Sequence, residues 1–316
     1  MRLKNSSKSL KNIILIIIFI IFFYIIYIAY SDFEEISSNM EEFEFTLLPI
    51  IFLFSFGAYS ITSLRQRILL KKIGIVISLK ENFLLYLAGL SMIVTPGGLG
   101  ETIKSYYLKK RFGYGISKTF PLVFVERYQD LITLVIVLSF ALIFIQIHEV
   151  MILDITVICV IIISYTIFRA KKLFVKIINF LKKISRLRKF GDNMSESYEG
   201  FYSMTEGKTM IKCAAVGIVS WTLEAIAVYL VFLAFNIDLG FILTTIIAYA
   251  AILFGGISLL PGGVGLTEIS ATTLLTKEGV ELSLATSIII MMRIATIWLS
   301  TATGFIASKF FISKKQ

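Results

Sequence analysis

Charge, cysteine and histidine are scarce in this sequence of 316 residues. Charged residues make up 16% of the chain, whereas soluble domains carry roughly 25%. Cys159 and Cys213 lie inside apolar runs, where we expect small buried side chains rather than a disulfide. The one histidine, His148, is expected to be solvated. The phosphate loop G-x-x-x-x-G-K-[ST] is absent. We therefore predict no disulfide, no metal site and no cofactor.

Long apolar runs, by contrast, are abundant, and 57% of the residues are hydrophobic. Such runs cover 13–30, 46–64, 131–147 and 151–168. Runs of about 17–25 apolar residues are long enough to cross a bilayer as helices. In lipid only helices or closed barrels satisfy their backbone hydrogen bonds, and the alternating pattern of barrel strands is absent here. The sequence therefore predicts an all-α integral membrane protein, multi-pass in the cell membrane.

Basic residues gather between the apolar runs, and their placement predicts the topology. They cluster at the N-terminus (Arg2, Lys4, Lys8, Lys11), at 65–80, at 104–118, at 169–189 and in the tail (Lys309, Lys314, Lys315). The net charge of +10 could indicate nucleic acid, but clusters between spans follow the positive-inside rule better. We therefore predict no nucleic-acid partner and place both termini in the cytoplasm.

This placement predicts six full transmembrane helices and two re-entrant helical hairpins. Both flanks of segment 82–103 are basic, so a hairpin keeps both on the cytoplasmic side, where a full span would not. Of the 31 basic residues, only Lys277 is then external, and only Arg127 and Arg293 fall within membrane-spanning segments.

A helix breaker occurs twice, each time with a carboxylate close behind it. The first reads PGGLGE from Pro96 to Glu101, and the second reads PGGVG from Pro261, followed by Glu268. An arginine lies on the next apolar segment in both cases, Arg127 and Arg293. Similar units of opposite orientation are typical of secondary transporters, whose sites lie near mid-membrane at broken helices. We therefore predict an inverted-topology repeat.

We predict a single polytopic membrane domain over 1–316. Its parts are a first span at 13–30, a first repeat at 45–147 with hairpin 82–103, a connecting span at 151–168, a basic cytoplasmic loop at 169–209, and a second repeat at 210–308 with hairpin 239–276. Within the loop, residues 169–190 place apolar residues at helical spacing between lysines, which is typical of a helix lying on an anionic membrane surface.

The breakers suggest an anion-binding site. Proline and glycine end one half-helix and start another, and the new N-terminus, near Gly100 or Gly265, is expected to present free N–H groups to an anion. Ionisable residues inside a membrane are costly and are functional candidates. The candidate substrate-binding residues are Pro96, Gly97, Gly98, Gly100, Glu101, Arg127, Asp130, Glu224, Pro261, Gly262, Gly263, Gly265, Glu268 and Arg293.

Two interpretations of these charges remain open. In the first interpretation, Arg127 and Arg293 hold an anionic headgroup, because an arginine fork suits phosphate. Glu101 and Glu268 then pair with these arginines when the site is empty. Alternatively, the pairs are structural salt bridges that tie each hairpin to a span. Asp130, one turn after Arg127, would orient its side chain in either case.

At these residues the chain resembles the lysylphosphatidylglycerol synthase transmembrane-region, or flippase-like, family. The resemblance rests on "TPGGLGETIKSYYL", "VERYQDL" and "LPGGVGLTEISATTLL" and extends over nearly the whole chain. It implies a multi-pass lipid-flippase domain, which some members fuse to a soluble aminoacyl-transferase. The chain leaves no room for that enzyme before Gln316, so lipid aminoacylation is not expected. Glu101 follows Gly100 directly whereas Glu268 comes later, so the two hairpins need not be equivalent.

The expected function is movement of an anionic phospholipid or a polyisoprenyl-phosphate-linked (glyco)lipid between leaflets, without enzymatic activity. The expected partners are membrane lipids with anionic headgroups, and a homo-oligomer or a lipid-synthesis enzyme. Three alternatives remain: a secondary transporter of a small soluble anion, a membrane-embedded lipid-modifying transferase, and a non-transporting membrane scaffold.

Overall fold

The computed structural model describes residues 18–170 and 194–313, and these residues form helices without a strand. Most of the predicted surface helix at 169–190 and the start of the first span lie outside the described residues. The helices are Ile18–Tyr30, α2 (Phe33–Glu41), η1 (Phe45–Leu47), α3 (Leu48–Lys72), α4 (Leu79–Leu90), η2 (Pro96–Thr102), α5 (Ile103–Phe112), α6 (Ile116–Thr119), α7 (Pro121–Leu142), α8 (His148–Arg169), α10 (Met194–Met204), α11 (Gly207–Ala234), α12 (Phe241–Ile257), η4 (Pro261–Gly263), α13 (Leu266–Lys277), α14 (Leu282–Arg293), η5 (Ile294–Trp298) and α15 (Leu299–Ser313).

Four helical segments are long and apolar enough to cross a membrane. They are Phe45–Lys72, His148–Ile167, Gly207–Ala234 and Leu282–Phe311. Helix α7 has 22 residues, but it carries Glu126, Arg127 and Asp130 within them. The predicted all-α, multi-pass membrane architecture is therefore confirmed.

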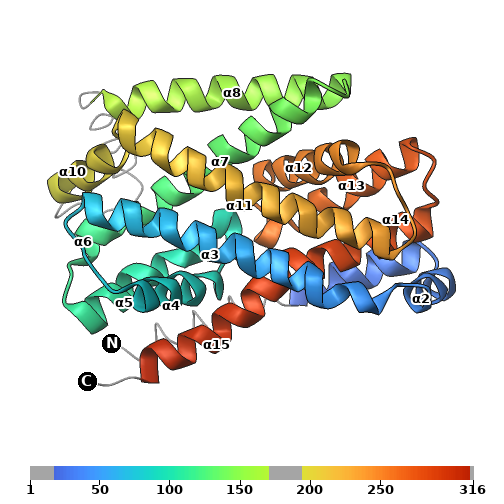
Figure 1. The fold of residues 1–316 in the computed structure, drawn as a ribbon, viewed down its shortest axis with the longest axis horizontal. Helices are drawn as coiled ribbons and strands as arrows, with labels where there is room; N and C mark the ends of the chain where they lie inside the picture. The colour runs from blue at the N-terminus through green and yellow to red at the C-terminus, as the bar shows by residue number, and fades with distance from the viewer. Residues whose placement is uncertain (1–17, 171–193, 314–316) are drawn as a thin grey trace.

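The two segments that contain the breakers lie against each other, and their long helices run in opposite directions. Helices α3 and α11 pack side by side along the longest axis of the molecule and run antiparallel (Figure 1). The pair α4–α5 lies at the end of the bundle where α3 finishes, and the pair α12–α13 lies at the opposite end (Figure 1). The two breaker segments, η2 and η4, contact each other between these hairpins. The hairpins thus meet tip to tip.

Glycine permits both breakers. Gly97 and Gly98 have φ values of 60° and 66°, and Gly262 and Gly263 have φ values of 63° and 67°. These left-handed conformations are readily adopted only by glycine. The chain can therefore reverse direction within a few residues in each hairpin.

Small residues hold the first hairpin close to the last helix. A Cβ atom at Gly304 on α15 would lie 2.2 Å from the Ser91 backbone nitrogen, which a real side chain could not do. One turn later the Ser308 hydroxyl donates a hydrogen bond of 3.2 Å to the Ala88 carbonyl oxygen. The end of α4 is therefore packed directly on the α15 backbone.

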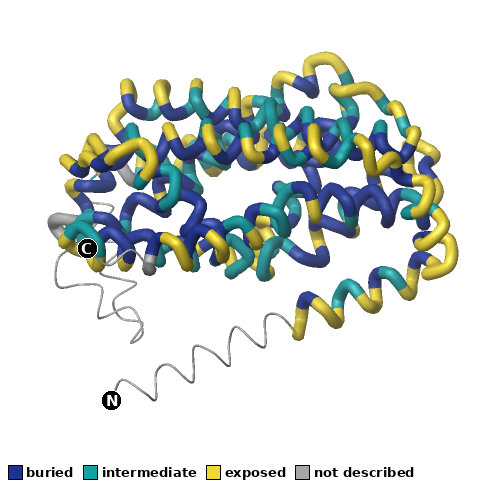
Figure 2. Tube along the Cα trace, turned by 60° about the horizontal axis from the view of Figure 1, so that its bottom comes forward, coloured by how far each residue is buried: buried dark blue, intermediate teal, exposed yellow. Residues whose placement is uncertain are grey.

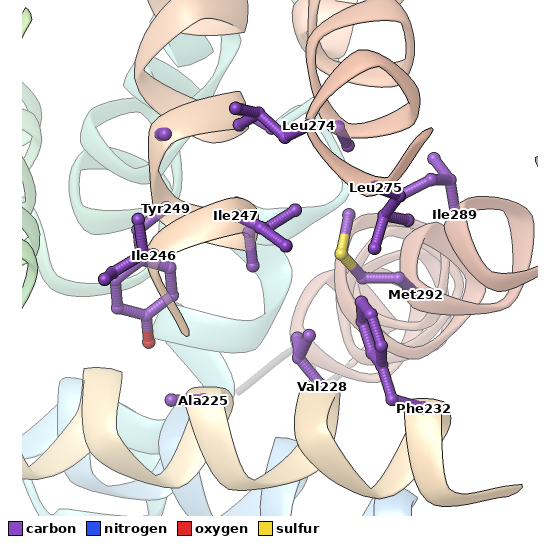
Figure 3. Close-up of a cluster of buried hydrophobic side chains, with 14 of the residues drawn as sticks. Ala225, Val228, Phe232, Ile246, Ile247, Tyr249, Leu274, Leu275, Ile289 and Met292 are labelled. Atoms are coloured by element: carbon purple, nitrogen blue, oxygen red, sulfur yellow. The ribbon is translucent and has the colours of Figure 1, made fainter. Parts of the chain in front are cut away.

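A large apolar core is built mainly by the helices of the C-terminal half, and α3, α7 and α8 also contribute to it. Helices α11, α12, α13 and α14 contribute buried side chains that include Phe232, Ile247, Leu275 and Met292 (Figure 3). Buried residues line the inside of the helix bundle, and exposed residues follow its outer faces (Figure 2). Many exposed residues are large and apolar, such as Phe140 at 63% exposure. An apolar outer surface of this kind suits a lipid environment.

The helices extend beyond several of the predicted segments. Residues 65–80 are predicted to form a basic cytoplasmic cluster, and within them α3 continues to Lys72 and buries Arg65. The return arm of the first hairpin does not end at 103, because α5 continues to Phe112 and buries Lys104. Arg65 and Lys104 can be buried within helices because each pairs with carboxylates, as described below. The predicted polar loop contains α10, which packs on α6 and α7.

Candidate functional site

The first breaker brings Glu101 into a buried ion cluster. Glu101 lies in η2, and Lys104 follows one turn later on the same side of the chain. The Lys104 ammonium lies 2.8 Å from Glu101 Oε2 and 2.8 Å from Glu126 Oε2 on α7. The side chains of Lys104 and Glu101 are fully buried. The lysine therefore ties the hairpin to α7 through two carboxylates.

Arg127 extends this cluster toward α3. Its Nη2 atom lies 3.2 Å from Glu101 Oε1 and 2.9 Å from Asp130 Oδ2. Asp130 also pairs with Arg65, which is 1% exposed. The expected role of Asp130 in orienting Arg127 agrees with this geometry, although Asp130 serves a second arginine as well. The Arg127 side chain is 29% exposed and is the most accessible cation of the cluster.

The second breaker forms a smaller and more closed site. Arg293 Nε lies 2.9 Å from Glu268 Oε1, and Arg293 Nη2 donates to the carbonyl oxygen of Gly262. The Tyr24 hydroxyl donates a hydrogen bond of 2.8 Å to Glu268 Oε1. The Arg293 side chain is only 6% exposed. Glu268 is thus held by three elements: its own half-helix, α14 and the Ile18–Tyr30 helix.

At the two half-helix starts, the N–H groups of Gly100 and Gly265 are bonded within the chain. The Gly100 N–H donates to Thr95 Oγ1 over 2.6 Å, and the Gly265 N–H donates to Glu268 Oε2 over 2.7 Å. The chain satisfies these donors itself because unpaired backbone groups are costly inside a membrane. In this state an anion would therefore meet the arginines rather than these two backbone donors.

The other breaker residues lie against the arginines. Pro96 and Pro261 each begin the short 3-10 segment of their hairpin. A Cβ atom at Gly98 would lie 3.2 Å from Arg127 Cδ, and one at Gly262 would lie 3.8 Å from Arg293 Nη2. Gly97 lies close to Leu259 of the other hairpin, and Gly263 lies close to Gly255 on α12. Both breakers therefore place glycine backbone beside an arginine and at the contact between hairpins.

A π-helical turn follows Arg293. The segment η5 interrupts the helix between α14 and α15, and such turns are frequent at functional sites. Side chains of α3 satisfy two of its carbonyl groups: Ser55 Oγ donates to Ala295 O over 3.0 Å, and the Tyr59 hydroxyl donates to Thr296 O over 2.9 Å. The irregular turn is therefore held by the first repeat.

Glu224 is the one predicted site residue outside both ion clusters. It lies on α11 and is half-buried. Electrostatic interactions link it to Asp130 and Arg127, so it belongs to the surroundings of the first site. The structure thus groups Glu101, Arg127, Asp130 and Glu224 on one side, and Glu268 with Arg293 on the other.

Sequence reasoning missed Arg65, Lys104 and Tyr24 as parts of these sites. The Glu101–Lys104 spacing was a usable signal, because residues three apart face each other on a helix. The return of apolar residues at Ile68–Leu70, after Arg65, Gln66 and Arg67, was a second signal. Tyr24 carried no local signal, since its partner Glu268 lies in the other half of the chain. Among the described residues, no group of histidine, cysteine and carboxylate side chains is arranged to hold a metal ion.

Comparisons with known proteins agree with the motifs. The family model of the lysylphosphatidylglycerol synthase TM region matches residues 13–304, which confirms the resemblance. A UPF0104 membrane protein of Pyrococcus horikoshii is 25% identical over 67% of this chain and 70% of its own length. One of Methanocaldococcus jannaschii is 25% identical over 64% of this chain and 85% of its own length. One of Methanothermobacter thermautotrophicus is 39% identical over 36% of this chain and 32% of its own length.

Proposed function

The chain belongs to the lysylphosphatidylglycerol synthase TM-region family, and on that premise we propose that it moves a lipid with an anionic phosphate headgroup between leaflets. One observation carries the proposal: two hairpins meet tip to tip, and each tip places a buried glutamate on an arginine. Ion pairs inside a membrane are costly and are retained mainly for function. The lipid class includes anionic phospholipids and polyisoprenyl-phosphate-linked glycolipids.

The proposed topology has six spans and two re-entrant hairpins in an inverted repeat, with the basic end in the cytoplasm. Ion pairs at the two ends of the bundle support this arrangement. At one end Lys72 pairs with Glu206, and Arg111 pairs with Glu81 over 3.2 Å. At the other end Lys277 pairs with Glu149 over 2.9 Å. Segments assigned to the same side from charge alone therefore contact each other.

The proposed mechanism is an exchange of partners at the arginines. In the empty state Arg127 holds Glu101 and Asp130, and Arg293 holds Glu268. A headgroup phosphate accepts two parallel hydrogen bonds from a guanidinium, so it competes with a carboxylate for the same fork. The headgroup would pass from one arginine to the other as one repeat moves against its partner. The proposed translocation involves no covalent step and is therefore not an enzymatic reaction.

The Ile18–Tyr30 helix favours a lipid over a soluble anion. Its Tyr24 touches Glu268 of the second site, and the Tyr27 hydroxyl pairs with Thr272 Oγ1 on α13. Most of its remaining surface is exposed and apolar: Ile18, Phe19, Ile21, Phe22, Ile25 and Ile26. A single peripheral helix with an apolar outer face therefore stands beside the site. Its displacement would open the site sideways, which lets a tail remain in the hydrocarbon.

The test is translocation in proteoliposomes. Vesicles would carry acyl-chain-labelled phosphatidylglycerol, phosphatidylcholine or a polyisoprenyl phosphate, and dithionite would bleach the label in the outer leaflet. We expect headgroup-dependent flipping by the wild type, a loss of at least tenfold in Arg127→Ala and Arg293→Ala, and intermediate rates in Glu268→Gln. The matched control is Lys277→Ala, which removes an exposed ion pair at the end of the bundle.

The outcomes separate the alternatives. Wild-type vesicles that match empty ones for every lipid would contradict the proposal. Uptake of a soluble anion without lipid flipping would instead indicate a secondary transporter. Folded arginine variants that flip lipid at the wild-type rate would show that the ion pairs are structural only.

A further inference from the structure

Glu224 is a carboxylate in the middle of an apolar helix and lacks a partner. Within the described part of the chain it forms no ion pair and no hydrogen bond, whereas Glu101, Glu126 and Glu268 each contact a cation. It is only half-buried, and α11 around it reads SWTLEAIAVYL. Ionisable residues in membrane-spanning helices are expensive and normally paired. An unpaired one therefore requires a reason.

The ionisable side chains that act on Glu224 come from α7, α3 and α12, among the elements packed on α11. Helix α7 contributes Asp130 and Arg127, and helices α3 and α12 contribute Tyr59 and Tyr249. The segments η1 and η5 contain no ionisable residue. The one ionisable residue of α14 is Arg293, which is bound to Glu268 and Gly262. Glu224 therefore acts on the first site, and no cation of the described residues is reserved for it.

The charges of the first site cancel without Glu224. Its three cations are Arg65, Lys104 and Arg127, and its three carboxylates are Glu101, Glu126 and Asp130. An ionised Glu224 adds one uncompensated negative charge beside Arg127. An anionic headgroup at Arg127 would add a second, and like charges in a medium of low dielectric repel strongly.

We propose that Glu224 takes up a proton when an anionic headgroup binds at Arg127, so that the lipid and one proton occupy the first site together. This inference rests on the proposed function and adds a coupling ion to it. Linkage is reciprocal, so protonation of Glu224 strengthens headgroup binding by the same factor as the headgroup strengthens protonation. Affinity should fall as the pH rises, by at most about tenfold per pH unit for one proton. Glu224 acts on the headgroup through Arg127, because its protonation changes the charge beside that arginine.

Calorimetry can count the proton directly. The full chain in detergent would be titrated with short-chain phosphatidylglycerol at pH 6, 7 and 8, each in two buffers of different ionisation enthalpy. We expect net proton uptake with the wild type and weaker binding at pH 8 than at pH 6. Glu224→Gln should bind as tightly as the wild type at pH 6, without proton uptake and without the pH dependence. Glu224→Asp should retain both, and short-chain phosphatidylcholine is the headgroup control.

Each outcome decides the inference. Phosphatidylglycerol binding without proton uptake by the wild type overturns it and leaves the proposed function intact. Equal uptake in wild type and Glu224→Gln overturns the assignment to Glu224, again without touching the proposed function. Failure of the wild type to bind phosphatidylglycerol at any pH overturns the inference together with the proposed headgroup. The wild-type count is informative even if Glu224→Gln does not fold.

Discussion

The two hairpins share a motif but not an electrostatic environment. At the first, six ionisable side chains from α3, η2, α5 and α7 form one cluster, and Arg127 remains partly accessible. At the second, a single Arg293–Glu268 pair is closed over by Tyr24 from a helix outside both repeats. Similar sequences thus make different sites, because each hairpin meets a different set of neighbouring helices.

This difference suggests a division of roles. The first site has a partly exposed arginine and an unpaired carboxylate beside it, which suits binding and release of an anion. The second has a buried arginine that contacts Glu268 and Gly262, and its access depends on a peripheral helix. Comparing matched variants in the two sites therefore tests whether the repeats act equally.

The largest effect is expected for Lys104→Met in the first site. The change leaves Glu101 and Glu126 buried against each other without their shared cation. Breaking a buried ion pair costs about 3–5 kcal/mol. Thermal unfolding in detergent should show a large loss of stability, whereas Lys109→Met on the exposed face of the same helix should be close to wild type. Equal stability of the two variants would mean that the cluster does not hold the hairpin.

A smaller effect is expected for Tyr24→Phe in the second site. The change removes the hydroxyl that donates to Glu268 and leaves the Arg293 and Gly265 contacts in place. Hydrogen bonds to charged groups contribute about 1.5–3 kcal/mol. We expect moderate destabilisation in the same unfolding assay, together with altered flipping rates. Tyr30→Phe is the control, because Tyr30 is 79% exposed. Identical behaviour of the two variants would show that the helix does not close the site.

The smallest effect is expected at the exposed pair Lys72–Glu206, far from both hairpin tips. The hydrogen bond from Lys72 lowers the pKa of the Glu206 carboxyl. A carboxyl with a lowered folded-state pKa stabilises the protein above its unfolded pKa, and this contribution disappears as the pH falls through the folded pKa. Unfolding temperatures of wild type and Lys72→Met should therefore differ slightly at pH 7 and converge in acid. Lys71→Met, which changes the exposed neighbour, should not show this convergence.

Much of the architecture could be predicted from local patterns. Hydropathy identified the four helices that are long and apolar enough to cross a membrane, because apolar length is a property of contiguous residues. The two Pro-Gly-Gly segments identified the turns, since only glycine readily adopts their left-handed conformations. The matching arginines and glutamates indicated which charges would meet, and the structure contains both pairs. These inferences needed only sequence spacing and residue chemistry.

The tertiary structure alone decided where the remaining charges lie. A basic residue at the end of an apolar run can face cytoplasm or a buried carboxylate, and the choice depends on partners distant in sequence. Arg65 is buried because α7 brings Asp130 to it, and Tyr24 seals Glu268 because the first helix packs on the second hairpin. Spacing within one helix cannot reveal such contacts, since they arise only when separate helices pack. The sequence therefore determined the helices, breakers and candidate ion pairs, whereas packing determined which site is open and which is closed.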